Sequence, residues 1–230
     1  SPRCWRFGPL PPDQPLLAFD TSAAHCAAAL LLRGHIITQT CEDMAKGQSE
    51  RLMPMIEEML TAAGFHWRDL GAVAVGVGPG NFTGIRISVA AARGLALGLG
   101  VPAVGVTGLE VLAFGCTGRS RVALPAPRGA FFVQDFLGGA PLAEPIEATL
   151  DDPHLWPTDP TVALIGDWPD LPNTARLISR PDTDTRLRAL AYLGARHTAT
   201  GAPLPAPFYM RAADAAPPSD PPPVILDADP

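Results

Sequence analysis

The order of apolar and polar positions divides the first half of the chain into short strands and two long helices. Three short apolar runs joined by polar turns predict an antiparallel meander. They cover residues 16–19, 27–32 and 35–40. From 49 to 63 apolar residues recur every three or four positions, which predicts an amphipathic helix that ends at Gly64.

Strands and helices alternate after this helix. The pattern predicts strands at 72–77 and 103–106, with helices at 83–99 and 109–114. Farther along it predicts strands at 122–124, 130–135 and 162–165, and then a helix at 185–195. Antiparallel strands followed by strands that are joined through helices are typical of a mixed sheet, so the predicted fold class is α/β.

The helix predicted at 83–99 is apolar around most of its circumference. Its polar side chains between positions 85 and 99 are Arg86, Ser88 and Arg93. Such a helix is buried on more than one side, either inside its own fold or against another chain. Ala90, Gly94 and Gly98 are spaced four residues apart, so they form a stripe of small residues that lets another helix approach closely.

Both long helices carry residues suited to a contact surface. The first contributes three methionines, whose flexible thioether side chains adapt to a partner. They are Met53, Met55 and Met59. We interpret the two helices together as a candidate protein interface. Its predicted residues are Met53, Ile56, Leu60, Val89, Ala90, Arg93 and Gly94.

Composition and charge narrow the classes of function. With 47% apolar and 17% charged residues, the chain has the balance of a globular protein with a core. A formal net charge of -6 disfavours a surface that neutralises nucleic-acid phosphates unaided, so we expect tRNA contact only through a partner. The chain has no run of eighteen apolar residues and no signal-peptide pattern, which predicts a cytoplasmic protein with no membrane segment.

The two ends of the chain differ in composition from the rest. Residues 1–15 contain five prolines, and residues 214–230 contain six prolines and four aspartates. Segments of this kind bury too little apolar surface to offset the entropy cost of ordering them. We therefore expect a flexible leader at 1–15 and a disordered tail at 214–230.

The sequence GVGPGNFTGIR at 76–86 joins a predicted strand to a predicted helix. Backbone N–H groups and the helix dipole at such a position can bind a phosphate. The spacing departs from both common nucleotide motifs, because Ile85 and Arg86 follow the last glycine and Thr83 takes the third glycine position. The alternative is a tight turn in which Thr83 caps the helix. Arg86 in the first turn opposes the helix dipole, so we expect an acidic partner for it.

Asp20 ends the first strand, where a carboxylate could hold a metal ion, and Thr21 and Ser22 follow it as possible phosphate ligands. The next residues are Ala23 and Ala24, whose Cβ atoms obstruct a close approach of phosphate to the backbone. Two interpretations stay open: a strand-end aspartate that makes local turn bonds, and the remnant of a nucleotide site.

The histidines, serines and cysteines form no catalytic or metal-binding pattern. The five histidines lack H-x-x-x-H and H-E-x-x-H spacing, and no G-x-S-x-G sequence occurs. The four cysteines show no C-x-x-C pair, which predicts free thiols. We expect no metal site and no catalytic residue in this chain.

Four segments carry a resemblance to a known family. They are LLAFDTS at 16–22, SERLMPMIEEML at 49–60, GPGNFTGIRISVAAARGLA at 78–96 and PFYMR at 207–211. Together they resemble the TsaB family, whose members are close relatives of the catalytic TsaD subunit. The last segment looks like the family's C-terminal Pro-x-Tyr-Leu-Arg element. The resemblance is strong over 16–114 and loose over 115–200.

The resemblance implies an actin-like ATPase fold, of the ASKHA or ribonuclease H-like class, with two lobes of mixed sheet and helices. We expect an N-terminal lobe at 16–107 and a smaller C-terminal lobe at 108–213. The implied role is that of a non-catalytic scaffold for a TsaD-like subunit that makes threonylcarbamoyladenosine (t6A) in tRNA, in an assembly joined by a TsaE-like ATPase. ATP and metal would then be bound by partner subunits, and the chain alone would form a homodimer.

In TsaD relatives a pair of histidines binds a metal after the glycine-rich loop and its helix. The corresponding positions here are Gly108 and Leu112, which have no ligand atoms, and Glu110 between them is a single carboxylate. The resemblance therefore implies that the fold's nucleotide positions are vestigial. They are Asp20, Thr21, Gly78, Pro79, Gly80, Thr83, Gly84 and Arg86. The alternative function is an ATP-dependent enzyme of the actin-like class or a glycoprotease-like peptidase.

Overall fold

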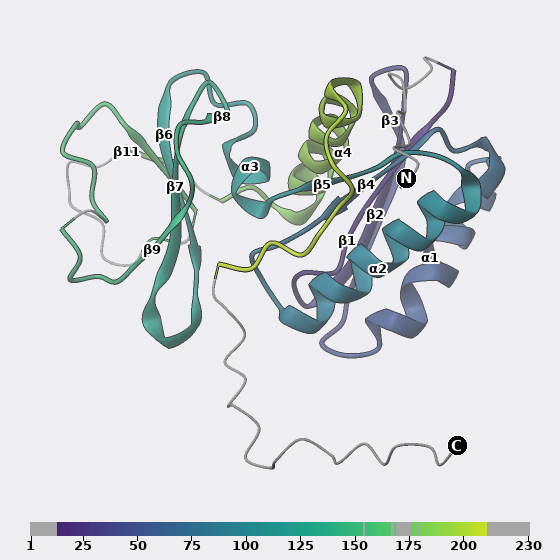
Figure 1. Ribbon diagram of the computed structural model, residues 1–230, viewed down its shortest axis with the longest axis horizontal. Coiled ribbons are helices and arrows are strands. Elements are labelled where there is room, and N and C mark those ends of the chain that lie inside the picture. Colours follow the sequence, from purple (N-terminus) through teal and green to yellow (C-terminus); the bar gives the residue numbers. More distant parts are fainter. Residues whose placement is uncertain (1–12, 154, 167, 169–175, 179, 211–230) are drawn as a thin grey trace, which may run out of the picture.

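The computed structural model describes residues 13–153, 155–166, 168, 176–178 and 180–210. Two sheets lie side by side, and helices pack on both faces of the first sheet (Figure 1). The predicted disordered tail at 214–230 lies outside the described residues, and so does most of the predicted leader. Of that leader, residues 13–15 are described, and the carbonyl oxygen of Pro15 accepts a hydrogen bond from Gly71 N–H.

The first sheet has five strands in the order β3-β2-β1-β4-β5. They are β1 (Leu16–Asp20), β2 (His25–Leu32), β3 (His35–Asp43), β4 (Ala72–Gly76) and β5 (Ala103–Val106). The first three strands pair antiparallel, whereas β4 and β5 add in parallel through helical connections. The predicted meander and the predicted mixed sheet are confirmed.

Helices cover both faces of this sheet. Helices α1 (Gln48–Ala62) and α2 (Phe82–Leu99) pack on one face, and α4 (Thr183–Thr200) packs on the other. Along β1, Leu17 and Phe19 point into the core beneath α1 and α2, while Leu16 and Ala18 point into the core beneath α4. All four side chains are fully buried, which explains why this strand is apolar at successive positions.

Helix α2 is the one helix among the described residues that is long and apolar enough to span a membrane. In this fold it lies on the first sheet and buries one side in the protein core. The buried residues on that side include Ile85, Val89, Ala92 and Ala96.

The second sheet has the order β11-β10-β6-β7-β8, and β9 also pairs with β7. Its strands are β6 (Arg119–Pro125), β7 (Phe131–Leu137), β8 (Ala140–Pro141), β9 (Ile146–Ala148), β10 (Ala163–Gly166) and β11 (Arg176–Ile178). Helix α3 (Gly108–Ala113) packs on this sheet through Leu109 and Leu112. Short 3-10 turns lie at η1 (Trp67–Asp69) and η2 (Pro127–Gly129). The strands β8, β9 and β11 were not predicted from the pattern.

The packing of α4 differs from the predicted division of the chain at residues 107 and 108. We expected α4 in the C-terminal lobe, but Leu187, Leu190 and Leu193 bury against the first sheet. Gly194 permits this contact, because a Cβ at that position would clash with the side chain of Ala74 on β4. The chain thus leaves the first lobe after β5, builds the second sheet, and returns to the first lobe.

Residues 202–210, which we call the C-terminal strap, follow α4 and cross back over the first lobe (Figure 1). The N–H of Phe208 donates a 2.9 Å hydrogen bond to the carbonyl oxygen of Val77, just after β4. The side chain of Phe208 packs against the core beneath α1 and α2. The strap therefore fixes the far end of the described chain to the glycine-rich loop.

Candidate functional site

The glycines of the loop at 76–84 allow two loops to touch. A Cβ at Gly84 would clash with the carbonyl oxygen of Thr21, and a Cβ at Gly80 would lie 2.5 Å from the carbonyl oxygen of Ser22. The hydroxyl of Thr21 donates a 2.7 Å hydrogen bond to the carbonyl oxygen of Gly84. The glycines thus serve the packing of the loop against the β1–β2 turn.

The N-cap of α2 is Asn81, so the prediction that Thr83 caps the helix is wrong. The Asn81 side-chain oxygen accepts a 2.9 Å hydrogen bond from Gly84 N–H. Asn81 N–H itself donates to the carbonyl oxygen of Ser22 at 2.7 Å. Because these amide groups already have partners inside the protein, they do not form an open phosphate cradle.

Asp20 makes the local bonds expected of a strand-end aspartate. Its Oδ2 accepts a 2.9 Å hydrogen bond from the hydroxyl of Ser22 and lies 2.9 Å from Nε2 of His25. Its Oδ1 is buried against Gly76 and has no hydrogen-bond partner among the described residues. Ser22 and His25 both bind the same carboxylate oxygen, so the serine is not paired with the histidine as a hydrolase nucleophile would be.

A cavity of about 170 Å³ lies between the two lobes and α4. Of the residues predicted as a vestigial nucleotide site, Asp20, Gly78, Pro79 and Gly80 line it. The remaining four do not line it. They are Thr21, Thr83, Gly84 and Arg86. Four of the eight predicted residues therefore lie at one cavity. The other four pack between the two loops or lie on the outer side of α2.

The cavity combines charged groups with apolar walls. Arg180 lines it from the segment before α4 and Arg186 from the first turn of α4, and Leu112 and Leu124 line it from the second lobe. Gly108 and Leu112 both lie in this wall, and neither has a side-chain atom that could bind a metal ion. Within the described ranges, no group of three or more His, Cys, Asp or Glu side chains is arranged to hold a metal ion.

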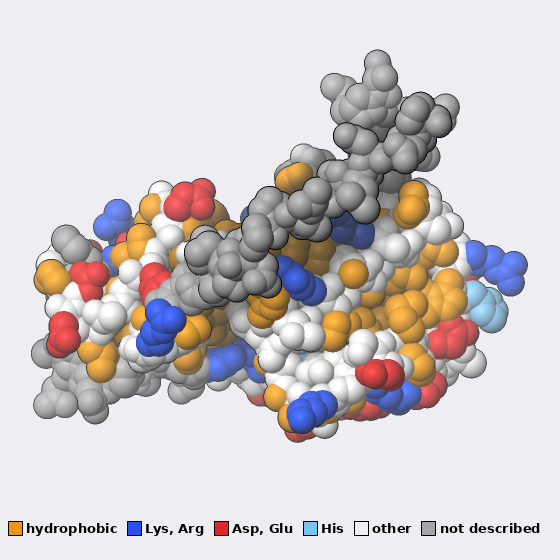
Figure 2. Space-filling view, turned by 60° about the horizontal axis from the view of Figure 1, so that its bottom comes forward, with side chains coloured by type: hydrophobic (Ala, Val, Ile, Leu, Met, Phe, Trp, Pro, Cys, Tyr) orange, Lys and Arg blue, Asp and Glu red, His pale blue; other side chains and the backbone are white. Residues whose placement is uncertain are grey.

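The outer side of α2 is exposed and lacks acidic residues. Ala90, Arg93 and Gly94 are exposed, and Leu97 has 80% of its surface accessible to solvent. A Cβ at Gly94 would meet no atom within 4 Å. Figure 2 shows hydrophobic side chains gathered on the side of the first lobe where α1 and α2 come forward. We call this surface, made by Met53, Ala90, Arg93, Gly94 and Leu97, the α1–α2 face.

Three residues of the predicted interface lie beneath this face. Ile56, Leu60 and Val89 are buried in the core of the first lobe, so they support the helices and cannot contact a partner directly. Of the three methionines, Met55 and Met59 are also buried, and Met53 alone is exposed. Helical periodicity identified an apolar surface on each helix but not which side of it faces outward.

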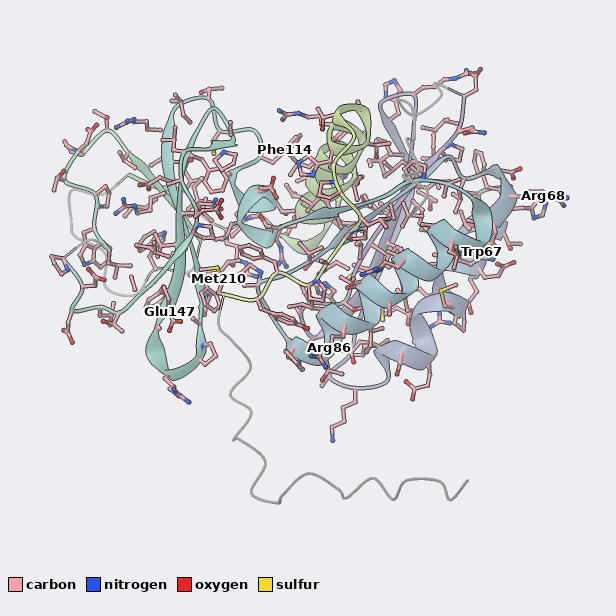
Figure 3. The ribbon with its side chains drawn as sticks, in the orientation of Figure 1. Trp67, Arg68, Arg86, Phe114, Glu147 and Met210 are labelled. Atoms are coloured by element: carbon pink, nitrogen blue, oxygen red, sulfur yellow. The ribbon has the colours of Figure 1, made fainter. Side chains whose placement is uncertain are left out.

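Arg86 is held by aromatic rings, and the expected acidic partner does not occur among the described residues. Its guanidinium lies 3.9 Å from the centroid of the Phe82 ring, and its Nε–H donates a 2.8 Å hydrogen bond to the hydroxyl of Tyr209. Phe82 and Tyr209 stack with their centroids 5.3 Å apart. Figure 3 labels Arg86 at the start of α2, beside the strap. A cation over an aromatic face is stabilised by the quadrupole of the ring.

A half-buried pair of titratable side chains, Glu110 and His197, joins α3 to α4, and no motif along the chain had indicated it. Nε2 of His197 lies 3.3 Å from Oε1 of Glu110, and Nδ1 of His197 lies 3.0 Å from the carbonyl oxygen of Gly105. Burial alone would raise the pKa of Glu110, but hydrogen bonds from His197 and Thr107 outweigh it and lower the pKa. The bond to Glu110 in turn raises the pKa of His197, although burial opposes it. Glu110 is therefore a structural partner of His197.

Comparisons with known proteins agree with this architecture. Residues 35–127 match the family model described as TsaD, tRNA N6-adenosine threonylcarbamoyltransferase. An uncharacterized protein of Mycobacterium tuberculosis is 30% identical over 207 residues, which cover 88% of this chain and 94% of that protein. The Escherichia coli tRNA threonylcarbamoyladenosine biosynthesis protein TsaB is 38% identical over 110 residues. The chain belongs to the TsaB family.

Solved structures of the family show the same fold. A Pseudomonas aeruginosa protein described as similar to the peptidase YEAZ has a TM-score of 0.65 and 25% identity, over 86% of this chain and all of that chain. YeaZ of the same organism has a TM-score of 0.62. The expected actin-like fold of two mixed sheets with helices is confirmed. The alignments span about half the length of the curated TsaB relatives, with 47% of the E. coli protein covered.

Proposed function

We propose that this TsaB-family chain is a non-catalytic scaffold subunit in the synthesis of t6A in tRNA. It binds a TsaD-like catalytic subunit through the α1–α2 face. The observation that carries the proposal is the outer side of α2, where small, apolar and arginine side chains are exposed and no acidic residue occurs from Phe82 to Leu99. The name of the TsaB relatives supports a role in t6A synthesis. The match to the TsaD family model supports pairing of this chain with a related TsaD-like subunit.

The chemistry of this face favours a protein partner. Leu97 is almost fully exposed and Gly94 leaves space above the helix, so another helix can approach closely. Contact surfaces are enriched in aromatic, methionine and arginine side chains and depleted of acids at their centre. On the neighbouring helix, α1 exposes Glu57 and Glu58, which carry the opposite charge to Arg93. A related subunit with the same two helices would meet this face with complementary charge about a pseudo-two-fold axis.

The cleft supports a non-catalytic role. Oδ2 of Asp20 is engaged by Ser22 and His25, and the loop amides of Asn81 and Gly84 have partners inside the fold. ATP and metal would accordingly be bound by the partner subunits, including a TsaE-like ATPase. In this proposal the complex is cytoplasmic, tRNA is contacted through the complex, and the chain alone forms a homodimer through the same face.

A bulky residue at Gly94 tests the proposal. Gly94→Trp places a large ring in the open space above α2 and should abolish co-purification with a TsaD-like subunit. Gly118→Trp is the matched control, because Gly118 is exposed in the second lobe and a Cβ added there would have no atom within 4 Å. This control should leave the complex intact. Circular dichroism checks that both variants fold. Normal complex formation by folded Gly94→Trp protein would contradict the proposal.

The alternative function is an ATP-dependent enzyme or a peptidase. The observation in its favour is the cavity that Asp20 lines between the lobes. Calorimetric titration of the chain with Mg-ATP, together with a casein cleavage assay, separates the two functions. Tight binding of Mg-ATP that is lost in Asp20→Asn, or cleavage of casein, would favour the enzyme over the scaffold.

A further inference from the structure

The imidazole of His197 lies at the junction between the two lobes and contacts residues of both. His197 lies on α4, which packs on the first sheet, whereas Glu110 lies on α3, which packs on the second sheet. The carbonyl oxygen of Gly105, on the other side of the ring, belongs to β5 at the edge of the first sheet. One side chain therefore bridges three elements at the point where the chain passes from one lobe to the other.

Both neighbours of the imidazole are hydrogen-bond acceptors. The carbonyl oxygen of Gly105 is 3.0 Å from Nδ1, and the carboxylate of Glu110 is 3.3 Å from Nε2. A neutral imidazole has one N–H, so it can donate to one of these two acceptors, whereas an imidazolium can donate to both. Both acceptors therefore receive an N–H from the ring only when His197 carries a proton on each nitrogen.

Glu110 is held in position to accept a hydrogen bond from Nε2–H of His197. Its Oε2 accepts hydrogen bonds from the backbone N–H and the hydroxyl of Thr107, both at 2.9 Å. Thr107 and Glu110 form a capping box at the start of α3, so the carboxylate cannot turn away without losing its half of that box. A change at His197 would therefore act on the N-terminal turn of α3 through Glu110.

The charged groups around the ring come from two elements. Among the described residues, Glu110 on α3 acts on His197 with a negative charge, and Arg196 on α4 acts with a positive one. β5 contributes the neutral carbonyl group of Gly105. The carboxylate contacts the ring directly, so it outweighs Arg196 and favours the protonated form.

A second contact between the same helices lies beyond this pair. The rings of Phe114 and Tyr192 stack with centroids 5.9 Å apart and planes 2° apart. Phe114, labelled in Figure 3, lies at the end of α3 on the side of α4. This stack has no group that titrates near neutral pH, so its own contribution does not change with the state of His197.

Helices α3 and α4 also form two walls of the cavity between the lobes. Gly108, Val111 and Leu112 line it from α3, and Leu187 and Leu190 line it from α4. Loosening the contact between the helices would therefore change the width of the cavity. We propose that His197 and Glu110 form a proton-operated latch, which holds α3 against α4 when the imidazole is protonated and loosens when it is neutral.

The latch can be tested on the intact chain by NMR and hydrogen exchange. The proton resonances of His197 should titrate with a pKa above the ordinary value of about 6.5. Amides of α3 and of 192–200 should become less protected between pH 5.5 and pH 8, by more than the chemical exchange rate changes, while the amides of α1 should follow the chemical rate alone.

Two substitutions separate a titrating latch from a purely structural contact. Glu110→Gln should lower the pKa of His197, because the carboxylate that favours the imidazolium is removed. His197→Gln keeps N–H donors but cannot titrate, so the pH dependence of exchange at α3 should disappear. His35→Gln is the matched control, because His35 is exposed on β3, and it should leave that pH dependence unchanged.

Either of two results would overturn the latch. One is a pKa of His197 at or below about 6.5 in the unmodified protein. The other is loss of protection at α3 that persists in His197→Gln. The first result needs no variant, so the test stands even where a substitution prevents folding.

Discussion

The Nε–H of Arg86 donates a 2.8 Å hydrogen bond to the hydroxyl of Tyr209, which joins the first turn of α2 to the end of the described chain. The same guanidinium covers the ring of Phe82, and 43% of the Tyr209 surface remains exposed. Arg86 is thus held by an aromatic cluster instead of an acid, and this cluster anchors the C-terminal strap.

Substitution of Tyr209 should separate the hydrogen bond from the stacking. Tyr209→Phe keeps the stack on Phe82 and loses one partly exposed hydrogen bond, so we expect a loss of about 0.5–1 kcal/mol in the free energy of unfolding. Tyr209→Ala removes the ring as well and should cost about 1 kcal/mol more. Urea unfolding followed by circular dichroism measures both, and equal stability of the two variants would show that the stack contributes nothing.

Two glycines in helices should respond to alanine in opposite directions. Gly194→Ala would force a Cβ into Ala74, so it should destabilise the fold by about 1–3 kcal/mol despite the better helix propensity of alanine. Gly98→Ala adds a Cβ in open space on α2 and should stabilise by roughly 0.5–1 kcal/mol. Thermal and urea unfolding at a fixed protein concentration decide the signs. A neutral Gly194→Ala would contradict the close packing of α4 on the sheet.

The thiol of Cys26 should be unreactive in the folded protein. Burial, with a smaller contribution from Glu42, raises its pKa to about 11. The thiolate is the reactive form, so little of it exists at pH 8 and the buried sulfur is shielded as well. Alkylation with iodoacetamide followed by mass spectrometry should modify Cys26 only after unfolding, with Cys116, which is partly exposed, as the comparison within the same chain. Rapid native labelling of Cys26 would place it outside the core.

The pair of Glu110 and His197 should stabilise the fold within a limited pH range. The folded pKa of Glu110 is lowered, so its contribution is present above its ordinary pKa of about 4.3 and is lost as the pH falls through the folded value. The folded pKa of His197 is raised, so its contribution is full below about pH 6.5 and is lost as the pH rises through the folded value. The pair therefore acts most strongly at about pH 5–6.

The measurement compares the unmodified chain with His197→Gln. The difference in their free energies of unfolding should be largest at about pH 5–6 and should shrink toward pH 8 and toward pH 3. Urea unfolding at a series of pH values gives the curve. A difference that is constant with pH would mean that the histidine acts through packing alone.

Local patterns predicted most elements of the first lobe. The strands β1 to β5 and helices α1 and α2 agree with their predicted ranges to within a few residues. In each, the apolar residues follow a clear pattern, and a glycine or polar residue marks the end of the element. The short strands β8, β9 and β11 were missed because two or three residues carry no period. The position of α4 on the first sheet was missed because periodicity reports an apolar side but not the sheet that covers it.

The candidate site shows the same limit. Sequence reasoning found the loop at 76–86 and the small-residue stripe of α2, since glycine and alanine spacing is visible along the chain. It placed Val89 on the outer face, because the side of α2 that faces the core depends on the sheet beneath it. It predicted an acidic partner for Arg86, because the contact with the C-terminal strap depends on residues far along the chain. Glu110 and His197 are far apart in the sequence, and neither belongs to a motif that would pair them.

The return of α4 to the first lobe bears on how the protein is made. The face of β1 that carries Leu16 and Ala18 is covered by residues of α4, and the loop after β4 is tied by Phe208. During synthesis from the N-terminus, this apolar face stays open to water until nearly the whole described chain has left the ribosome. The first lobe therefore cannot bury this face until α4 has been synthesised, after all the described strands of the second sheet.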